Sequence, residues 1–214
     1  MKTLNVEQTQ EMIEHVCDAI IESKPYLTEV DSKIGDGDHG IGMAGGMQKA
    51  KEELRLKKPF TDINGIFKTT GMAMLNSMGG ASGVIFGSMF LGGIKGKESI
   101  TALSSSVLAE LMRGSLTAIM QRGKAQVGDK TMVDALAPAV EALEESRGED
   151  LETALEKAVQ AAEWGVEETK KYVAKFGRAK SLMERAVGYQ DAGATSVSII
   201  FRAMYEYVKG GDRG

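Results

Sequence analysis

The chain has 214 residues, of which 43% are hydrophobic and 26% are charged, and these values fit one globular domain, expected over residues 1–214. Its formal net charge of −4 provides no broad basic surface, which argues against sequence-independent binding to nucleic acid or to an anionic membrane. The single cysteine, Cys17, and the lack of any run of roughly 18 apolar residues favour a cytoplasmic protein without a disulfide framework or a membrane span.

Helical periodicity runs through most of the chain, whereas alternating β-branched residues, the usual sign of a sheet, are rare. Asn5 is expected to cap the first helix and Pro25 to begin the second. The spacing predicts about eight helices and a last one near 193–209, the eight lying at 5–23, 25–32, 38–56, 62–77, 81–94, 102–122, 130–145 and 150–175. The simplest architecture for such a chain is an all-α bundle.

Many of the 26 glycines fall in clusters at the ends of these predicted helices. The clusters lie at 35–46, 79–83, 123–128 and 188–193, apart from the glycines of the C-terminal tail. If antiparallel helices are joined by such turns, several clusters converge at one end of the bundle. A ligand site is expected at that end.

The stretch from Ile34 to Met43, "IGDGDHGIGM", contains the string G-x-G-x-x-G but places Asp36 and Asp38 among its glycines. A dinucleotide site of the Rossmann type requires a preceding strand, which "YLTEVDSKI" does not resemble, and gains nothing from carboxylates beside a pyrophosphate. The spacing of Asp31, Asp36 and Asp38 does not match an EF-hand calcium loop either.

Two interpretations of this stretch remain open on the residues alone. Carboxylates and phosphates can share a divalent cation, and Mg²⁺ is commonly held by one or two carboxylates together with substrate phosphates. In that case the three aspartates serve the metal and His39 is a polar contact beside it. Alternatively, the string is an acidic, solvated turn that caps the next helix.

Three later stretches offer groups that suit a phosphate. "NSMGGASGVIFG" around Gly79 places a small-residue turn and Ser82 at the start of an apolar helix, where free N–H groups bind anions, although close helix packing explains small residues equally well. "GKAQVGDKTMVDAL" repeats the pattern around Gly128. Near the end, Arg178 supplies a charged fork suited to phosphate, and Asp191 lies in another turn.

The motifs of several other kinds of catalytic site are absent from this sequence. The Walker A string, the protein-kinase set and G-x-S-x-G do not occur. With only 2 histidines there is little material for a catalytic triad or a zinc site. A nucleotide phosphate held with Mg²⁺ remains the best chemistry.

Taken together and in this order, the motifs "IGDGDHG", "MGGASG", "RGKAQVGDKTM", "GRAKSLMER" and "DAGATS" resemble the nucleotide-binding L subunits of bacterial dihydroxyacetone kinases over nearly the full length. This resemblance implies an up-and-down barrel of eight antiparallel helices with ADP or ATP at one end. This chain departs from the family pattern at four positions, namely Gly42, Met183, Tyr189 and Ala192.

The resemblance also implies roles for individual residues. Asp31, Asp36 and Asp38 would ligate two Mg²⁺ ions, and Arg178 and His39 would be the catalytic groups. Gly123 and Met132 would lie along the adenosine, and the segment from Asp191 to Gly193 would close the site. The full set of nucleotide contacts implied is His39, Gly40, Ile41, Gly42, Ala81, Ser82, Gly123, Met132, Arg178, Asp191, Ala192 and Gly193.

The function implied by the resemblance is phosphoryl transfer to dihydroxyacetone, or to a related ketose, held on a separate K subunit. The expected phosphoryl donor is a protein of the phosphotransferase system that rephosphorylates bound ADP. The alternatives are an ATP-dependent kinase subunit and a non-catalytic nucleotide sensor that docks on a transcription regulator. A kinase domain for fatty acids, which shares the barrel, ranks third.

Overall fold

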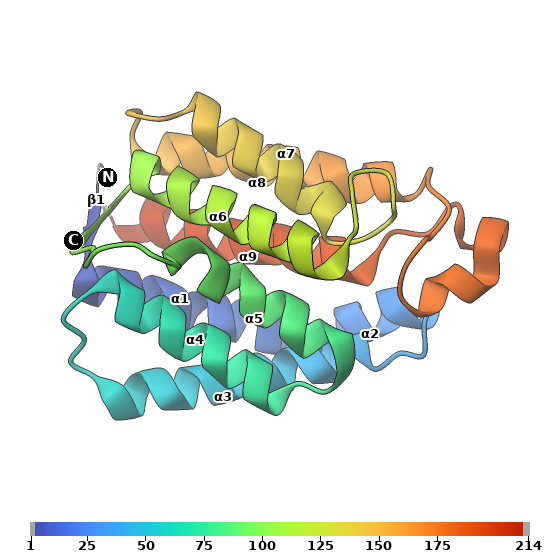
Figure 1. Ribbon diagram of the computed structural model, residues 1–214, viewed down its shortest axis with the longest axis horizontal. Coiled ribbons are helices and arrows are strands. Elements are labelled where there is room, and N and C mark those ends of the chain that lie inside the picture. The colour runs from blue at the N-terminus through green and yellow to red at the C-terminus, as the bar shows by residue number, and fades with distance from the viewer. Residues whose placement is uncertain (1–2, 212–214) are drawn as a thin grey trace.

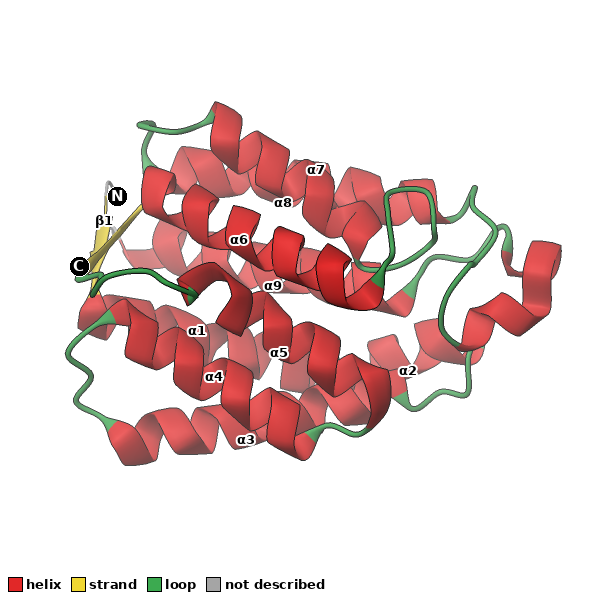
Figure 2. Cartoon of the chain, viewed as in Figure 1, coloured by secondary structure: helices red, strands yellow, loops and turns green. Residues whose placement is uncertain are grey.

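The computed structural model describes residues 3–211, and nearly all of its regular structure is helical (Figure 2). Two short strands, β1 (Thr3–Asn5) and β2 (Ala102–Ser104), and one 3₁₀ helix, η1 (Arg178–Ala186), accompany the α-helices. The α-helices are α1 (Val6–Glu22), α2 (Lys24–Ser32), α3 (His39–Lys57), α4 (Ile63–Ser77), α5 (Gly80–Ile94), α6 (Ser105–Gly123), α7 (Val133–Glu145), α8 (Leu151–Thr169) and α9 (Ala192–Gly210).

Eight of these helices form a closed ring (Figure 1). The packing order around the ring is α1, α3, α4, α5, α6, α7, α8 and α9, and α9 closes the ring by packing against α1. Successive helices run in opposite directions, and α2 lies at one end, in contact with α3 and α9. The expected all-α, up-and-down, eight-helix barrel is therefore confirmed.

The apolar side of each ring helix faces a shared core, as the helical periodicity predicts. Met12, Val16 and Ile20 of the first predicted stripe are fully buried. In the facing half of the ring, Phe67 of α4 and Phe90 of α5 pack with ring centroids 5.9 Å apart. Removal of this apolar surface from water is the main stabilising contribution to the barrel.

The end of the barrel that holds β1 confirms one predicted helix start and corrects another. Asn5 caps α1 in a reciprocal capping box with Gln8. The helix predicted to begin at 102 begins at Ser105 instead, because residues 102–104 form β2, which pairs antiparallel with β1. Leu4 and Leu103 lie opposite each other in this pair and are both buried, which provides the packing that helical periodicity did not reveal.

The other end corrects two predicted boundaries. The helix predicted at 130–145 begins at Val133, because the Asp134 carboxylate accepts hydrogen bonds from the N–H groups of Gly128 and Thr131 and folds the preceding residues into a loop. The helix predicted at 150–175 ends at Thr169. Residues 170–190, called the strap below, cross the end of the barrel and contain η1, which the helical pattern did not predict (Figure 1).

Within residues 3–211, none of the helices combines the length and the apolar character that crossing a lipid bilayer requires.

Candidate functional site

Three carboxylates meet where α2 leads into α3. Asp31 lies in the last turn of α2, and Asp36 and Asp38 lie in the loop that follows, residues 33–38, called the aspartate loop below. One oxygen of each can be chosen so that all three lie within 4.8 Å of one another. The structure therefore brings together the three aspartates that the sequence singled out as metal ligands.

The loop folds in this way because Gly35 allows it. The N–H groups of Ile34 and Gly35 both donate to the Asp31 carbonyl oxygen, at 3.1 and 2.6 Å, and Ile34 is buried beneath them. A Cβ atom at position 35 would lie 2.8 Å from the Asp31 Cγ atom and 3.0 Å from its carbonyl oxygen. A larger residue would thus displace the Asp31 carboxylate from the cluster.

Arg178, from the strap, is the cation that faces these carboxylates. Its Nε donates to Asp36 at 2.6 Å, and a terminal nitrogen lies 3.9 Å from Asp38. Desolvation and the negative charge of Asp36 raise the pKa of Asp38, and the nearby Arg178 partly opposes this shift. Crowded anions that share one arginine are a favourable environment for a further cation.

The donor set fits Mg²⁺. A hard divalent cation prefers carboxylate oxygens and commonly takes one or two of them together with phosphate oxygens. Asp36 and Asp38 are accessible to solvent, with 37% and 70% of their side-chain surface exposed, so a ligand can reach them. The cluster is thus open on the side that a phosphate would approach.

His39, at the start of α3, lies deeper than the aspartates. Its Nε2 is hydrogen-bonded to the Ser196 hydroxyl of α9 at 2.8 Å, and its ring packs against Phe86 of α5 at 5.8 Å. Its backbone N–H donates to Asp31 at 3.3 Å. Burial lowers the pKa of His39, which keeps the ring neutral near pH 7, although the charge of Asp31 opposes the shift. The ring therefore joins three helices and orients the loop.

The start of α5 lies beside the start of α3. The His39 ring of α3 packs against the Phe86 ring of α5, and a Cβ atom at Gly42 would lie 3.9 Å from the Met78 Cε. Gly79 precedes the helix and has no side chain with which to cap it. Ala81 and Ser82 in the first turn are exposed. First-turn N–H groups without a cap, together with the helix dipole, form a site for an anion.

The remaining predicted contact residues lie at the same end of the barrel. Gly123 ends α6 next to Ile85 of α5, since a Cβ atom there would lie 3.2 Å from the Ile85 Cδ1. Gly193 of α9 approaches Met132, which precedes α7, since a Cβ atom at Gly193 would lie 3.4 Å from the Met132 Cβ. The other predicted contact residues are Gly40 and Ile41, in the first turn of α3, and Ala192, in the first turn of α9.

Asp191 caps α9 by accepting from the Ala194 N–H at 2.7 Å. Burial raises the pKa of this carboxyl to about 7, although its hydrogen bonds to the helix N–H groups and the charge of Lys130 act in the opposite direction. Lys130 was not singled out in the sequence. It lies between Asp129 and Thr131, the two residues of this turn that the sequence offers as helix caps, but the sequence does not reveal its distant partners.

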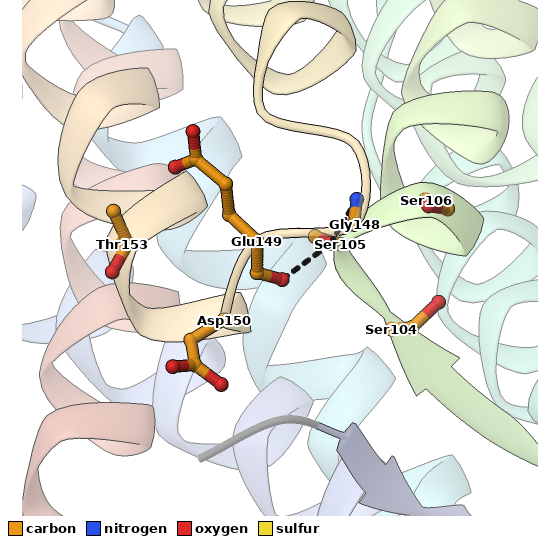
Figure 3. A pocket seen from close by; sticks show the side chains of 7 residues that line it. All are labelled: Ser104, Ser105, Ser106, Gly148, Glu149, Asp150 and Thr153. Carbon is orange, nitrogen blue, oxygen red and sulfur yellow. Dashed lines mark hydrogen bonds between the residues drawn. The ribbon is translucent and has the colours of Figure 1, made fainter.

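A separate hollow of about 570 Å³ lies at the opposite end of the barrel, between the starts of α6 and α8 (Figure 3). The Ser105 hydroxyl, which lines this hollow, already has hydrogen-bond partners within the protein. It donates to the Glu149 carbonyl oxygen at 2.8 Å and accepts from the Gly148 N–H at 3.2 Å. Glu149 and Asp150 would repel a phosphate there. The glycine-rich motifs and the three clustered aspartates singled out from the sequence lie at the other end.

The DAK2 domain model matches residues 33–206, which is most of the chain and includes the aspartate loop, the start of α5 and the strap. The chain belongs to the DAK2 domain family. The resemblance read from the motifs is thereby confirmed.

Two relatives of similar sequence are ADP-binding subunits named DhaL. The chain is 40% identical to DhaL of the PEP-dependent dihydroxyacetone kinase of Escherichia coli K12, over 84% of the chain and 86% of the relative. It is 39% identical to DhaL of the PTS-dependent enzyme of Lactococcus lactis, over 96% and 99%.

A similar structure occurs in the dihydroxyacetone kinase of C. freundii, solved in complex with AMP-PNP and Mg²⁺. The TM-score is 0.73 at 27% sequence identity, and the match covers 96% of this chain. The chain spans only 34% of that kinase, so it corresponds to one part of the larger protein.

Proposed function

We propose that this chain is the nucleotide-binding subunit of a dihydroxyacetone kinase and binds ADP or ATP with Mg²⁺ at the end of the barrel where α2, α3, α5 and the strap meet. The observation that supports this most directly is the coincidence of two findings. The chain shares 40% identity with an ADP-binding subunit over most of both chains, and three clustered carboxylates lie beside the uncapped start of α5.

The residues of this chain bind and orient the nucleotide. We assign Asp31, Asp36 and Asp38 as the residues that would hold two Mg²⁺ ions, which would supply positive charge to neutralise the phosphates in the transition state. The N–H groups of the first turn of α5 and the Ser82 hydroxyl donate to phosphate oxygens. Gly123 and Met132 flank the adenosine.

Arg178 and His39 have different parts in this proposal. Arg178 is exposed and charged, and it donates to phosphate oxygens in place of its present partner, Asp36. His39 is neutral and its Nε2 is already hydrogen-bonded to Ser196, so it holds the aspartate loop in position. Its contact with a phosphate would require that bond to be exchanged.

The reaction is phosphoryl transfer to a small hydroxyketone on a separate K subunit, either dihydroxyacetone or a related ketose. A hydroxyl oxygen of the ketone forms a bond to the terminal phosphorus of the nucleotide, the bond from that phosphorus to ADP breaks, and the hydroxyl proton passes to a base of the K subunit. A phosphoryl donor of the phosphotransferase system restores the terminal phosphate on bound ADP.

The first experiment is to purify the protein with Mg²⁺ and no added nucleotide, denature it and identify what is released by chromatography. Release of nearly one ADP per chain would support a retained coenzyme. An empty protein that binds ATP with Mg²⁺ in calorimetry would support an exchangeable co-substrate. An empty protein that binds neither ADP nor ATP would overturn the proposal.

The assignment of substrate and donor needs the complete system. With a K subunit and dihydroxyacetone present, phosphorylated ketone should form when phosphoenolpyruvate and the phosphotransferase proteins are added. Formation only with ATP would instead identify an ATP-dependent kinase subunit. Nucleotide binding without any transfer under either condition would favour the sensor function.

A further inference from the structure

The strap that carries Arg178 is held at both ends by one buried side chain. The Lys130 ammonium donates to the carbonyl oxygen of Thr169, at 2.5 Å, and to that of Tyr189. These carbonyls lie immediately before the strap and at its far end. Lys130 is 2% exposed, so its ammonium lies almost entirely out of water.

A buried ammonium is costly unless its charge and its hydrogen bonds are satisfied. The carboxylates of Asp134 and Asp191 are its charged neighbours, and they oppose the effect of burial, which lowers the pKa of Lys130. Its backbone adopts φ of 60°, a conformation that few non-glycine residues take. A lysine kept under these conditions has a specific partner, and here the partners are the two ends of the strap.

The preceding residue, Asp129, holds the middle of the same segment. Its carboxylate forms an ion pair with the Lys175 ammonium at 2.6 Å, and its carbonyl oxygen accepts from the Lys175 N–H at 3.2 Å. Asp129 is itself buried. Two consecutive residues thus hold the segment at three places, near Thr169, Lys175 and Tyr189.

The strap has little other packing. Most of its apolar contacts form a small cluster in which Ala174 and Ala186 meet Ile34 of the aspartate loop, and Phe176 also packs against the edge of the main core. Segments with few buried apolar contacts open at low free-energy cost. The position of Arg178 relative to the aspartates therefore depends on polar tethers more than on burial.

We propose that Lys130, supported by Asp129, is a positioning residue of the nucleotide site: by tying the two ends of the strap together it holds Arg178 in front of Asp36 and Asp38. The inference rests on the proposed function, because it assumes that Arg178 donates to nucleotide phosphates. Lys130 itself contacts neither metal nor nucleotide and acts through Arg178.

The test compares ADP affinity by calorimetry at saturating Mg²⁺ in the wild type and in the variant Lys130→Met, which keeps the length of the side chain and removes the ammonium. We expect an affinity loss of about tenfold or more, the usual effect of removing a supporting group at a metal site. Trypsin should also cleave the variant faster after Arg178, Lys180 and Arg185, because the strap opens more often.

A double-mutant cycle separates positioning from general damage. If Lys130 acts through Arg178, Lys130→Met should change ADP affinity by less than about twofold when Arg178→Ala is already present. An undiminished loss in that background would overturn the inference. So would equal ADP affinity of the wild type and Lys130→Met. A wild type that binds no ADP would overturn the proposed function as well.

Two exposed lysines provide a test that does not depend on the folding of the Lys130 variant. Lys175 and Lys171 are both 66% exposed and both form ion pairs, but Lys175 pairs with Asp129, which is 46 residues away, whereas Lys171 pairs with Glu168 one turn away. Lys175→Met should weaken ADP binding by about threefold, as expected for the loss of one largely exposed ion pair. Lys171→Met should leave it unchanged, and equal effects of the two would contradict the tether.

Discussion

Asp38 is the most exposed of the three clustered carboxylates, and its pKa is raised by desolvation and by Asp36. An ionised carboxylate in such surroundings slightly lowers the stability of the protein without a bound cation, and its charge becomes favourable when a cation binds. This leads to a prediction that separates a metal ligand from a capping residue. Asp38 makes no side-chain capping bond to α3.

We predict that Asp38→Asn lowers the Mg²⁺-dependent affinity for ADP by at least about tenfold, while the free energy of unfolding of the protein without nucleotide changes by at most about 0.5 kcal/mol. Calorimetry and urea unfolding measure the two quantities. Asp150→Asn is the matched control, since Asp150 is an exposed aspartate at the opposite end that also makes no side-chain capping bond. Equal ADP affinity in Asp38→Asn and the wild type would remove the metal assignment.

Asp191 gives the chain a pH-dependent contribution to its stability. Its pKa rises from 3.8 in the unfolded chain to about 7 in the folded one, so the folded state binds the proton more tightly. The contribution of Asp191 to stability is therefore greatest at low pH and falls as the pH rises from about 4 to about 7. Asparagine has no such proton and can still cap α9.

As the pH rises from 4 to 8, we expect the free energy of unfolding of Asp191→Asn to increase relative to that of the wild type by about 1–4 kcal/mol. One unit of pKa shift corresponds to about 1.4 kcal/mol. Urea unfolding of both proteins at several pH values, without nucleotide, provides the measurement. Stability curves that stay parallel across this range would show that Asp191 remains ionised at low pH.

The residues that the sequence revealed were those whose type suits one task. Asp31, Asp36 and Asp38 stood out because three carboxylates in a glycine-rich turn have few uses, and Asn5 stood out as a helix cap. Lys130 and Ser196 did not, because their partners are distant in the chain: Lys130 bonds to Thr169 and Tyr189, and Ser196 to His39. Such pairs exist only after the ring of helices has closed.

At the scale of elements, α7 and α8 approach closely because Gly165 has no side chain. A Cβ atom there would lie 2.7 Å from the Ala135 Cα and closer still to the Asp134 carbonyl oxygen. Gly45 in α3 is also inside a helix, but nothing lies within 4 Å of the position that its Cβ would take. Gly165 and Gly45 are therefore matched positions for a test, because both lie inside helices but only Gly165 is crowded.

We predict that Gly165→Ala destabilises the protein by about 1–3 kcal/mol, since the two helices must move apart, whereas Gly45→Ala stabilises it by about 0.5–1 kcal/mol through helix propensity. Chemical denaturation of both variants measures the difference. A stabilising effect of Gly165→Ala would mean that the helices separate without loss of packing.

The positions of the α-helices followed from the 3.6-residue period, and the errors arose where contacts between distant segments decide the backbone. Residues 102–104 form a strand because β1 is available to pair with them. The helix after Leu151 stops at Thr169 because the following residues are held by Lys130 and Asp129. Periodicity describes one helix at a time and does not contain this information.

At the scale of the whole molecule, the proposed site collects groups from α2, α3, α5, α9 and the strap, so a bound nucleotide would hold together parts of the chain that are far apart in sequence. Binding to the folded state alone stabilises a protein by about 2.7 kcal/mol when the ligand concentration is 100 times Kd. For a chain of this size, that corresponds to a rise in Tm of about 5–10 °C.

We therefore expect ADP with Mg²⁺ to raise the Tm by several degrees in a thermal scan, and excess EDTA to abolish most of the rise while ADP is still present. EDTA added to the protein without nucleotide should leave the Tm unchanged. A full rise with ADP and EDTA together would show that ADP binds without a divalent cation.

The first and last described residues, Thr3 and Gly211, both lie at the end of the barrel opposite the aspartates (Figure 1). The helix α9 alone has 19 residues, a length of roughly 28 Å, between that end and the other. A label or surface anchor joined to either end of the chain would be separated from the proposed site by the length of the barrel. Molecules attached to a biosensor in this way would all present the open end to the solution, where the approach of a partner protein could be followed.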